Sequence, residues 1–224
     1  SILTLSELKE WNSLLVNTYN RVLALHNKRW NGIWFRIIRN YFWSATAGEF
    51  DVVIGNPPWV RWSKLPELYR ERVKPTCLKY KIFSDTPYHG GNELDISGMI
   101  TYTVSDKWLR ENGQLLFLLT QTHFQSASSK GFREFTINED YHLKPLFVED
   151  LKELKPFPDA ANKTAIFIAK KTAESPQYPI PYTLWHAQSG VSKKIPEDIS
   201  KEKISGLISF EKNEATPVNV DGSP

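Results

Sequence analysis

The sequence is poor in cysteine and in long apolar segments. Cys77 is the single cysteine among 224 residues, so the chain cannot form an internal disulfide and an oxidising compartment is not indicated. The longest purely apolar run, residues 115–119, is far shorter than the ~20 residues that a membrane helix needs. No charged, apolar and small-residue leader opens the chain. These absences favour a cytoplasmic protein that does not enter a membrane.

Metal-binding and nuclease chemistry also lack their usual residues. Pro158-Asp159 is not followed by the acidic-x-Lys triplet of a nuclease site. The histidines follow no metal-ligand spacing; they are His26, His89, His123, His142 and His186. The sequence therefore predicts no metal centre and no cleavage site.

The charge of the chain is informative mainly through its distribution. A formal charge of +3 is too small to establish a nucleic-acid partner. Residues 61–81, however, contain seven lysines and arginines against two glutamates. A solvated loop would also explain such a run, so its meaning depends on what lies beside it.

Hydrophobic periodicity predicts helices first and then a strand. Apolar residues recur at intervals of three and four from Leu5 to about Tyr41, which predicts a helical hairpin interrupted near Asn31-Gly32. The β-branched run from Phe50 to Gly55 is typical of a short, buried parallel strand. A polar, basic loop is expected from there to about Gly91.

The rest of the chain continues the alternation of helix and strand. We expect helices at 96–109 and 128–135, and strands at 115–119, 145–151, 163–169 and 182–185. The strands at 145–151 and 163–169 are close enough to pair. This pattern indicates an α/β fold with an open parallel sheet covered on both faces, in which the final hairpin forms an antiparallel edge.

The string Asn56-Pro57-Pro58-Trp59 directly follows the first predicted strand. A turn that merely ends the strand is one interpretation, because Pro-Pro does terminate strands. The functional interpretation is methylation of an exocyclic amino group, a poor nucleophile because its lone pair is shared with the ring. Acceptors aimed at its two hydrogens, the Asn56 side-chain oxygen and the Pro57 carbonyl, favour a tetrahedral nitrogen whose lone pair points at the methyl donor.

The prolines and the tryptophan suit this chemistry. Proline fixes φ and holds the preceding residue extended, so the direction of the Pro57 carbonyl is set before binding. The face of Trp59 would stack on a base rotated out of a duplex, which returns roughly 1 to 3 kcal/mol per base. We predict Asn56, Pro57 and Trp59 as catalytic residues that converge on one opening.

The segment FDVVIGNPPW, residues 50–59, resembles motif IV of the amino-methyltransferases of DNA. Later segments are similar to their motifs V to VIII in the same order: Asn92 to Ser97, Gly113 to Thr122, Gly131 to Arg133, and Lys155 to Pro158 with Lys163 to Ile166. The resemblance runs from about His26 to Pro224. It is closest to the large type IIG restriction-modification adenine methylases and their relatives in phage defence.

The resemblance implies methyl transfer from S-adenosylmethionine to the amino group of a flipped adenine in DNA. It also implies roles for further residues. Asp95 and Ile96 would line the cofactor site, and Phe157 would be the second aromatic wall around the target base. Basic residues near the extruded base would contact phosphates, and the candidates are Arg61, Lys64, Arg70 and Lys163.

One family feature is missing from the sequence. The Phe-x-Gly-x-Gly loop that binds the methyl donor does not occur before Asp51. We therefore expect strands 4 to 7 of a Rossmann-like methyltransferase sheet, with the first strands outside this chain. The expected domains are a partial catalytic domain at 1–175, divided into a helical lead-in at 1–45 and a target-base half at 46–175, and a connection toward a target-recognition domain at 176–224.

The expected partners follow from this interpretation. They are double-stranded DNA, the N-terminal part and the specificity domain of the same polypeptide, and a second copy of the chain at the uncovered strand 50–55. Two alternatives stay open. One is a non-catalytic DNA-binding or scaffolding module derived from the fold, and the other is a methyltransferase acting on a protein glutamine or an RNA guanine.

Overall fold

The computed structural model describes residues 5–28, 33–83, 94–157, 161–193 and 199–217. The chain divides into two compact units, residues 1–48 and 49–224. The first unit contains the helices α1 (Leu5–Asn27) and α2 (Ile33–Thr46). The helices predicted from the periodicity are therefore confirmed, with α2 continuing beyond the predicted end. The predicted interruption at Asn31-Gly32 lies outside the described residues.

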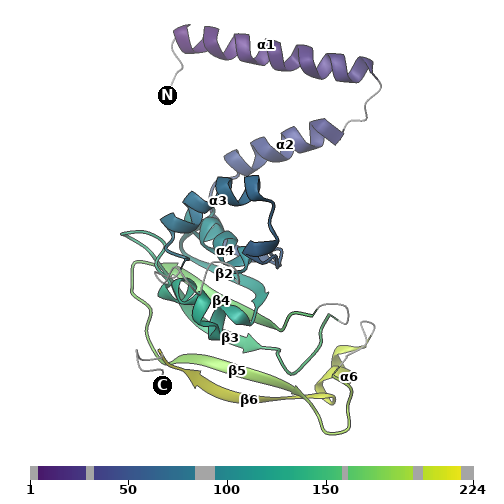
Figure 1. Ribbon diagram of the computed structural model, residues 1–224, viewed down its shortest axis with the longest axis vertical. Coiled ribbons are helices and arrows are strands. Elements are labelled where there is room, and N and C mark those ends of the chain that lie inside the picture. The colour runs from purple at the N-terminus through teal and green to yellow at the C-terminus, as the bar shows by residue number, and fades with distance from the viewer. Residues whose placement is uncertain (1–4, 29–32, 84–93, 158–160, 194–198, 218–224) are drawn as a thin grey trace. The chain divides into compact units, whose positions relative to one another are not determined.

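The described residues of the second unit form one six-stranded mixed sheet (Figure 1). Its strands are β1 (Phe50–Gly55), β2 (Leu109–Thr120), β3 (His142–Asp150), β4 (Thr164–Thr172), β5 (Ile180–Ala187) and β6 (Ile208–Ala215). The order across the sheet is β1-β2-β4-β3-β5-β6. β1, β2, β3 and β5 run in one direction, whereas β4 and β6 run against them. The carboxyl ends of β1, β2 and β3 therefore lie at the same edge.

The sheet corrects two expectations. It is mixed and not parallel, because β4 lies between β2 and β3 and is antiparallel to both. β3 and β4 do pair as predicted, but they occupy the interior of the sheet, so the prediction that they form its edge was wrong. Residues 176–224, expected as a connection, contribute β5 and β6 to the same sheet, so the edges belong to β1 and β6.

The helices of the second unit differ from the prediction at two places. α3 (Glu67–Lys79) occupies much of the segment predicted as a loop, because Pro75 lies inside the helix and did not end it. α4 (Ile96–Lys107) begins one residue after Asp95, whose side chain accepts a hydrogen bond from the Ser97 amide at 2.9 Å and so caps the helix. The helix predicted at 128–135 is a pair of 3-10 turns. The short elements are η1 (Trp62–Lys64), α5 (Thr122–Gln125), η2 (Ala127–Ser129), η3 (Gly131–Glu134) and α6 (Lys201–Ser205).

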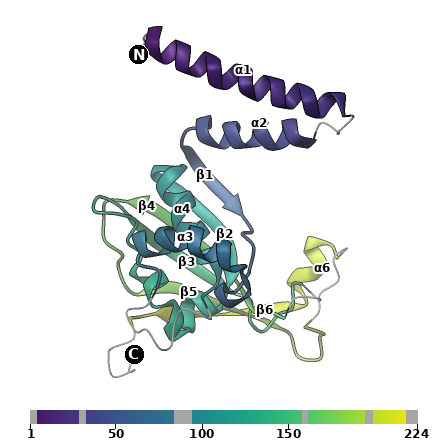
Figure 2. The ribbon, with the colours of Figure 1, turned by 45° about the horizontal axis from the view of Figure 1, so that its top comes forward.

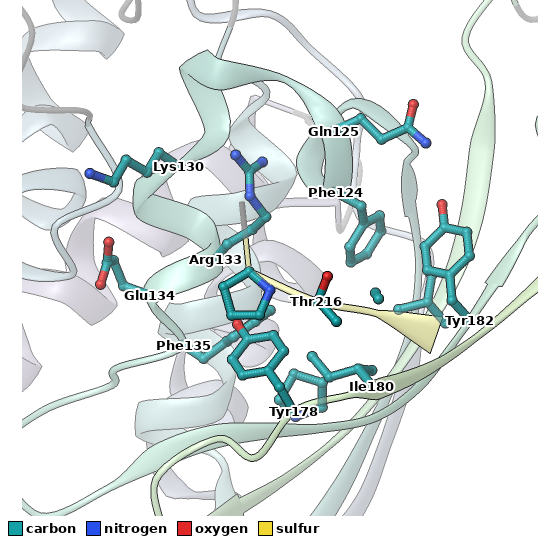
Figure 3. A pocket seen from close by; sticks show the side chains of 14 residues that line it. Phe124, Gln125, Lys130, Arg133, Glu134, Phe135, Tyr178, Ile180, Tyr182 and Thr216 are labelled. Atoms are coloured by element: carbon teal, nitrogen blue, oxygen red, sulfur yellow. The ribbon is translucent and has the colours of Figure 1, made fainter. Parts of the chain in front are cut away.

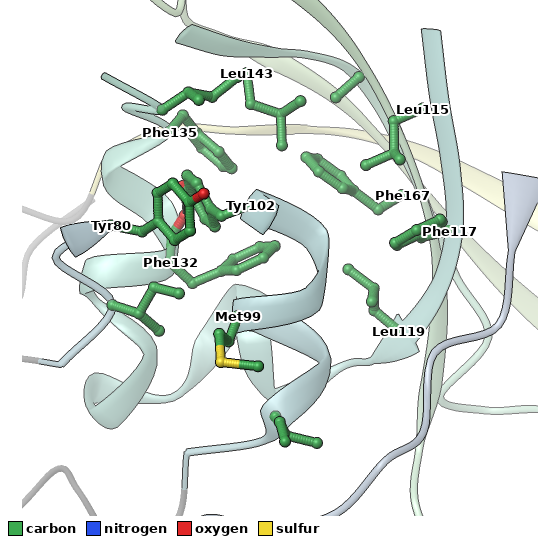
Figure 4. Close-up of a cluster of buried hydrophobic side chains, with 14 of the residues drawn as sticks. Tyr80, Met99, Tyr102, Leu115, Phe117, Leu119, Phe132, Phe135, Leu143 and Phe167 are labelled. Atoms are coloured by element: carbon green, nitrogen blue, oxygen red, sulfur yellow. Dashed lines mark hydrogen bonds between the residues drawn. The ribbon is translucent and has the colours of Figure 1, made fainter. Parts of the chain in front are cut away.

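The hydrophobic core lies between one face of the sheet and the helices α3 and α4 (Figures 2 and 4). Tyr102 of α4 is fully buried, and its hydroxyl donates to the Phe132 carbonyl at 2.6 Å. The centroid of the Phe132 ring lies 5.8 Å from the centroid of the Phe167 ring of β4. This aromatic cluster connects helix, turn and sheet.

The opposite face of the sheet is less covered within the described residues. Leu116, Leu118 and Ile166 alternate with the buried positions and are only half-buried. On β1, Val52 is 54% exposed and Ile54 is 70% exposed. The expected cover on both faces is therefore incomplete in the described part of the chain. No described helix is long and apolar enough to span a membrane.

A network around Asp106 joins α3, α4 and the turn before β3. Its carboxylate accepts hydrogen bonds from Lys79 Nζ at 2.6 Å, the Tyr80 hydroxyl at 2.8 Å and Asn138 Nδ2 at 3.2 Å. Burial alone would raise the pKa of Asp106, but the bonds from Lys79 and Tyr80 outweigh it and hold the pKa below its ordinary value. The ionised carboxylate therefore stabilises the folded chain.

We expect this network to make stability pH-dependent in acid. Its contribution is complete above the ordinary aspartate pKa of about 4, and it is lost as the pH falls through the lower pKa of folded Asp106. Urea unfolding at pH 6 and pH 3 should show a smaller drop in the free energy of unfolding for Asp106→Asn than for the wild type. Equal drops for the two proteins would contradict the assignment.

Gly131 is required by a close approach of two backbones. A Cβ atom at this position would lie 2.1 Å from the Lys81 carbonyl oxygen and 2.6 Å from that of Ile82. Because these neighbours are backbone atoms, they cannot move aside as a side chain could. Residues 81–82 and the turn η3 are thereby packed against each other.

The substitution Gly131→Ala should lower the free energy of unfolding by about 3 kcal/mol, the upper part of the usual range for overpacking. Gly206→Ala is the matched control, because its nearest atom, the Lys203 oxygen, would lie at 3.5 Å, an ordinary contact. Urea denaturation of both variants measures the difference. Wild-type stability in the Gly131 variant would show that the two segments separate at little cost.

Candidate active site

The Asn-Pro-Pro-Trp loop follows the last residue of β1 at the carboxyl edge of the sheet. Asn56 is exposed, Pro57 is buried and Trp59 is half-buried. The Trp59 Nε1 group donates a hydrogen bond to the Leu118 carbonyl of β2 at 3.2 Å. This bond ties the loop to the neighbouring strand and leaves the Asn56 side chain in contact with solvent.

The structure brings Trp59 and Phe157 together, although they are far apart in the sequence. Their ring centroids lie 5.5 Å apart, with 72° between the ring planes, which is an edge-to-face contact. Phe157 belongs to the loop after β3 and is 38% exposed. Two strand ends thus contribute one aromatic residue each to the same place.

A second pairing fixes the chain just beyond Trp59. The backbones of Arg61 and Asp95 pair in an isolated antiparallel β-bridge. The Trp62 amide donates to the Leu94 carbonyl at 2.7 Å, and the Ile96 amide donates to the Val60 carbonyl at 2.9 Å. The segments that resemble motifs IV and V therefore lie side by side. The first two residues of the motif V segment, Asn92 and Glu93, lie outside the described residues.

The two predicted cofactor residues are buried. Asp95 and Ile96 are each 4% exposed. Burial raises the pKa of Asp95, opposed by the hydrogen bonds from Ser97 and by the charge of Arg61. The Asp95 carboxyl group caps the N-terminus of α4. Its backbone pairs with Arg61, just after the Asn-Pro-Pro-Trp loop.

A buried polar pair behind the loop was missed by sequence reasoning. Ser97 Oγ and His123 Nε2 lie 2.8 Å apart, and both residues are fully buried. Burial, with a smaller effect from the Arg133 charge, lowers the pKa of His123 to about 3, so its imidazole is neutral at physiological pH. Its position just after a buried strand was the only signal, and histidine spacing alone does not distinguish a packing role from a chemical one.

The predicted DNA-contacting residues lie on three segments of the chain. Arg61 and Lys64 are exposed on the chain that follows Trp59, and Arg70 is half-buried on α3. Lys163 is exposed immediately before β4, where its carbonyl accepts the Gln121 amide at 2.9 Å. Lys163 thus lies at the edge where β2 ends, the edge at which Asn56 also lies.

The described residues contain no group of three or more histidine, cysteine or acidic side chains that could hold a metal ion. Cys77 is buried in the core, and burial raises the pKa of its thiol to about 12. At neutral pH this thiol carries no nucleophilic charge.

A cavity of about 660 Å³ lies elsewhere in the second unit (Figure 3). Aromatic rings form much of its wall, including Phe124, Phe135, Tyr178 and Tyr182, and Arg133 contributes a guanidinium. Neither the Asn-Pro-Pro-Trp loop nor Phe157 contributes to its lining. The cavity is therefore distinct from the place where Trp59 meets Phe157.

Comparison with known proteins matches a segment that contains the Asn-Pro-Pro-Trp loop. The family described as Eco57I restriction-modification methylase matches residues 6–153. The type II methyltransferases M.HincII and M.HindII, from Haemophilus influenzae and its strain Rd, are each 28% identical over 133 residues. The aligned part is 59% of this chain and 24% of each relative, so the chain spans about a quarter of their length.

Solved structures with a similar arrangement come from restriction-modification enzymes. The type ISP enzyme LlaBIII bound to DNA aligns with a TM-score of 0.48 and 15% identity, covering 78% of this chain and 12% of that one. The type IIG restriction endonuclease BpuSI aligns with a TM-score of 0.43 and 12% identity, covering 76% of this chain and 20% of that one.

The geometry predicts different effects of the two loop residues on stability. Trp59→Ala removes the bond to Leu118 and the contact with Phe157, and should lower the free energy of unfolding by about 1–3 kcal/mol. Asn56→Ala should change it by less than about 0.5 kcal/mol, because the Asn56 side chain is exposed. Chemical denaturation of both variants checks this. A large loss in the Asn56 variant would mean that its side chain supports the fold.

Proposed function

Because the chain belongs to the Eco57I restriction-modification methylase family, we propose that it forms the target-base side of a site-specific DNA adenine methyltransferase. The observation that carries the proposal is the meeting of Trp59 and Phe157 beside an exposed Asn56. An aromatic pair and an amide at the carboxyl edge of the sheet suit a base turned out of its duplex. The substrate is then double-stranded DNA.

In the proposed reaction, Asn56 and Pro57 act on the adenine amino group. The Asn56 side-chain oxygen and the Pro57 carbonyl accept its two hydrogens, which directs the nitrogen lone pair toward the methyl group. Pro57 is buried and followed by a second proline, which restricts the loop before any base arrives. Trp59 is held by its bond to Leu118, so its ring position is also set in advance.

Methyltransferases of this family use S-adenosylmethionine, which supplies an electrophilic methyl group. The residues of this chain do not by themselves fit a donor site. The sequence lacks the Phe-x-Gly-x-Gly loop, and Asp95 and Ile96 are buried, with the Asp95 carboxylate engaged at the start of α4. We propose that donor binding requires further residues of a longer protein, because the curated relatives are about four times as long as the aligned segment.

The sheet itself supports a need for a further segment. β1 pairs only with β2 among the described strands, and its outer edge has no strand partner there. The exposed Val52 and Ile54 on this strand belong to an apolar face, which favours burial against another segment. We propose that the donor-binding strands of the complete enzyme occupy this edge and correspond to the first strands of a Rossmann-like sheet.

DNA contact is assigned to the basic residues around the loop. Arg61 and Lys64 follow Trp59 directly and are exposed, and Lys163 lies at the same edge of the sheet. Cations placed beside a turned-out base neutralise the phosphates that flank it. We expect Arg70 to contribute less to DNA binding, because it is half-buried on α3. The complete enzyme is proposed to serve a restriction-modification or phage-defence system.

Loss of the Asn56 acceptor should slow methylation without much effect on DNA binding. In the complete protein, Asn56→Ala is expected to reduce the rate by about a hundredfold, the usual cost of one transition-state acceptor. The readout is N6-methyladenine in the DNA of a bacterial host without methylases of its own. Asn213→Ala, an exposed asparagine on β6, is the matched control and should methylate normally.

The same experiment separates the other interpretations. Methylation near the wild-type level in the Asn56 variant would refute the proposed role. Methyl groups found on RNA guanine or protein glutamine, and not on DNA, would change the substrate class. A complete protein that binds DNA but transfers no methyl group to any acceptor would be a scaffolding module.

A further inference from the structure

The loop that carries Phe157 is held in place by β5 and the segment after it. The loop leaves β3 at Asp150, and β3 pairs in parallel with β5, so Asp150 lies beside Leu184. Two residues beyond the family match support this loop: Tyr182 of β5 donates to Asp150 at the end of β3, and the Lys193 carbonyl accepts the Lys155 amide within the loop. The position of Phe157 therefore depends on the later part of the chain.

Asp150 is the centre of this support. It is fully buried, and each of its oxygens has a partner. Oδ1 accepts the Lys152 amide at 2.8 Å, which forms the first turn of the loop. Oδ2 accepts the Tyr182 hydroxyl at 2.5 Å. Without the Tyr182 hydroxyl, the Asp150 carboxyl group would have one hydrogen-bond donor fewer, so the turn that it holds would become easier to open.

The segment after β5 supplies a second attachment. The Lys155 amide donates to the Lys193 carbonyl at 2.9 Å. The Lys193 ammonium also pairs with Glu153 at 3.0 Å, but both side chains are substantially exposed, so this ion pair adds little. The hydrogen bonds donated by the Lys152 and Lys155 amides lie on the path between Asp150 and Phe157.

We propose that Tyr182 is a positioning residue for Phe157, and that β5 sets the geometry of the second aromatic wall through the bond from Tyr182 to Asp150. The assignment of Phe157 as a base contact rests on the proposed function, whereas the support of the loop rests on the bonds themselves. The Tyr182 ring also lines the cavity of Figure 3. The ring therefore has a packing role that does not depend on the hydroxyl.

The test removes the hydroxyl and keeps the ring. In the 224-residue chain, Tyr182→Phe should speed amide hydrogen exchange at Lys152 and Lys155 by about fivefold, the effect of one lost hydrogen bond. Exchange in β1 and β2 should be unchanged. Tyr178→Phe is the matched control, because Tyr178 lines the same cavity and has no described bond to residues 151–157. Unchanged exchange at Lys152 in the Tyr182 variant would overturn the proposal, and so would faster exchange throughout the sheet.

A double-mutant cycle in the complete protein tests the link to Phe157. Tyr182→Phe alone should reduce adenine methylation about fivefold, and it should cause no further loss in a protein that already carries Phe157→Ala. Independent, multiplicative losses would overturn the link. If the wild-type complete protein methylates no adenine, the proposed function fails, and the exchange measurement still decides whether Tyr182 positions the loop.

Discussion

The parallel pairing of β1 with β2 determines where the residues of the candidate site lie. Residues 53–55 pair with residues 115–117, and a Cβ atom on Gly55 would lie 3.0 Å from the Phe117 ring, so the two strands meet closely at their carboxyl ends. Leu118 is the next residue of β2, and its carbonyl accepts a hydrogen bond from the Trp59 indole N–H. The loop is therefore fixed by the neighbouring strand as well as by its own prolines. A loop fixed at both ends can present Asn56 to solvent without losing its conformation.

Backbone pairing and one buried hydrogen bond connect the elements behind the loop. The backbone β-bridge between Arg61 and Asp95 joins the loop to the start of α4, and Ser97 joins α4 to His123 of α5, which follows β2. His123 is neutral because burial lowers its pKa, so this connection costs no buried charge at neutral pH. Asp95 remains the one carboxylate in this connection. Its hydrogen bond from the Ser97 amide offsets part of the cost of burying it.

The sequence predicted the local features well because each has a local cause. The run from Phe50 to Gly55 is β-branched and is ended by prolines, and the strand has those bounds in the structure. Strand order was not predictable, because the insertion of β4 between β2 and β3 follows from packing between distant segments. α3 was missed because its apolar residues do not form one buried stripe; Leu68, for example, is 82% exposed. The contact of Phe157 with Trp59 was expected from the order of motifs, whereas the support from Tyr182 has no sequence signal.

The two aromatic residues of the candidate site are held by different strands. The Asn-Pro-Pro-Trp loop lies inside the segment matched by the family, whereas Phe157 lies beyond its last residue, 153. One wall is tied to β2 and the other to β5, and β3 and β4 separate these strands. On this proposal a change in β5 reaches Phe157 through Asp150 and the loop that follows it, whereas Trp59 is held by its hydrogen bond to β2.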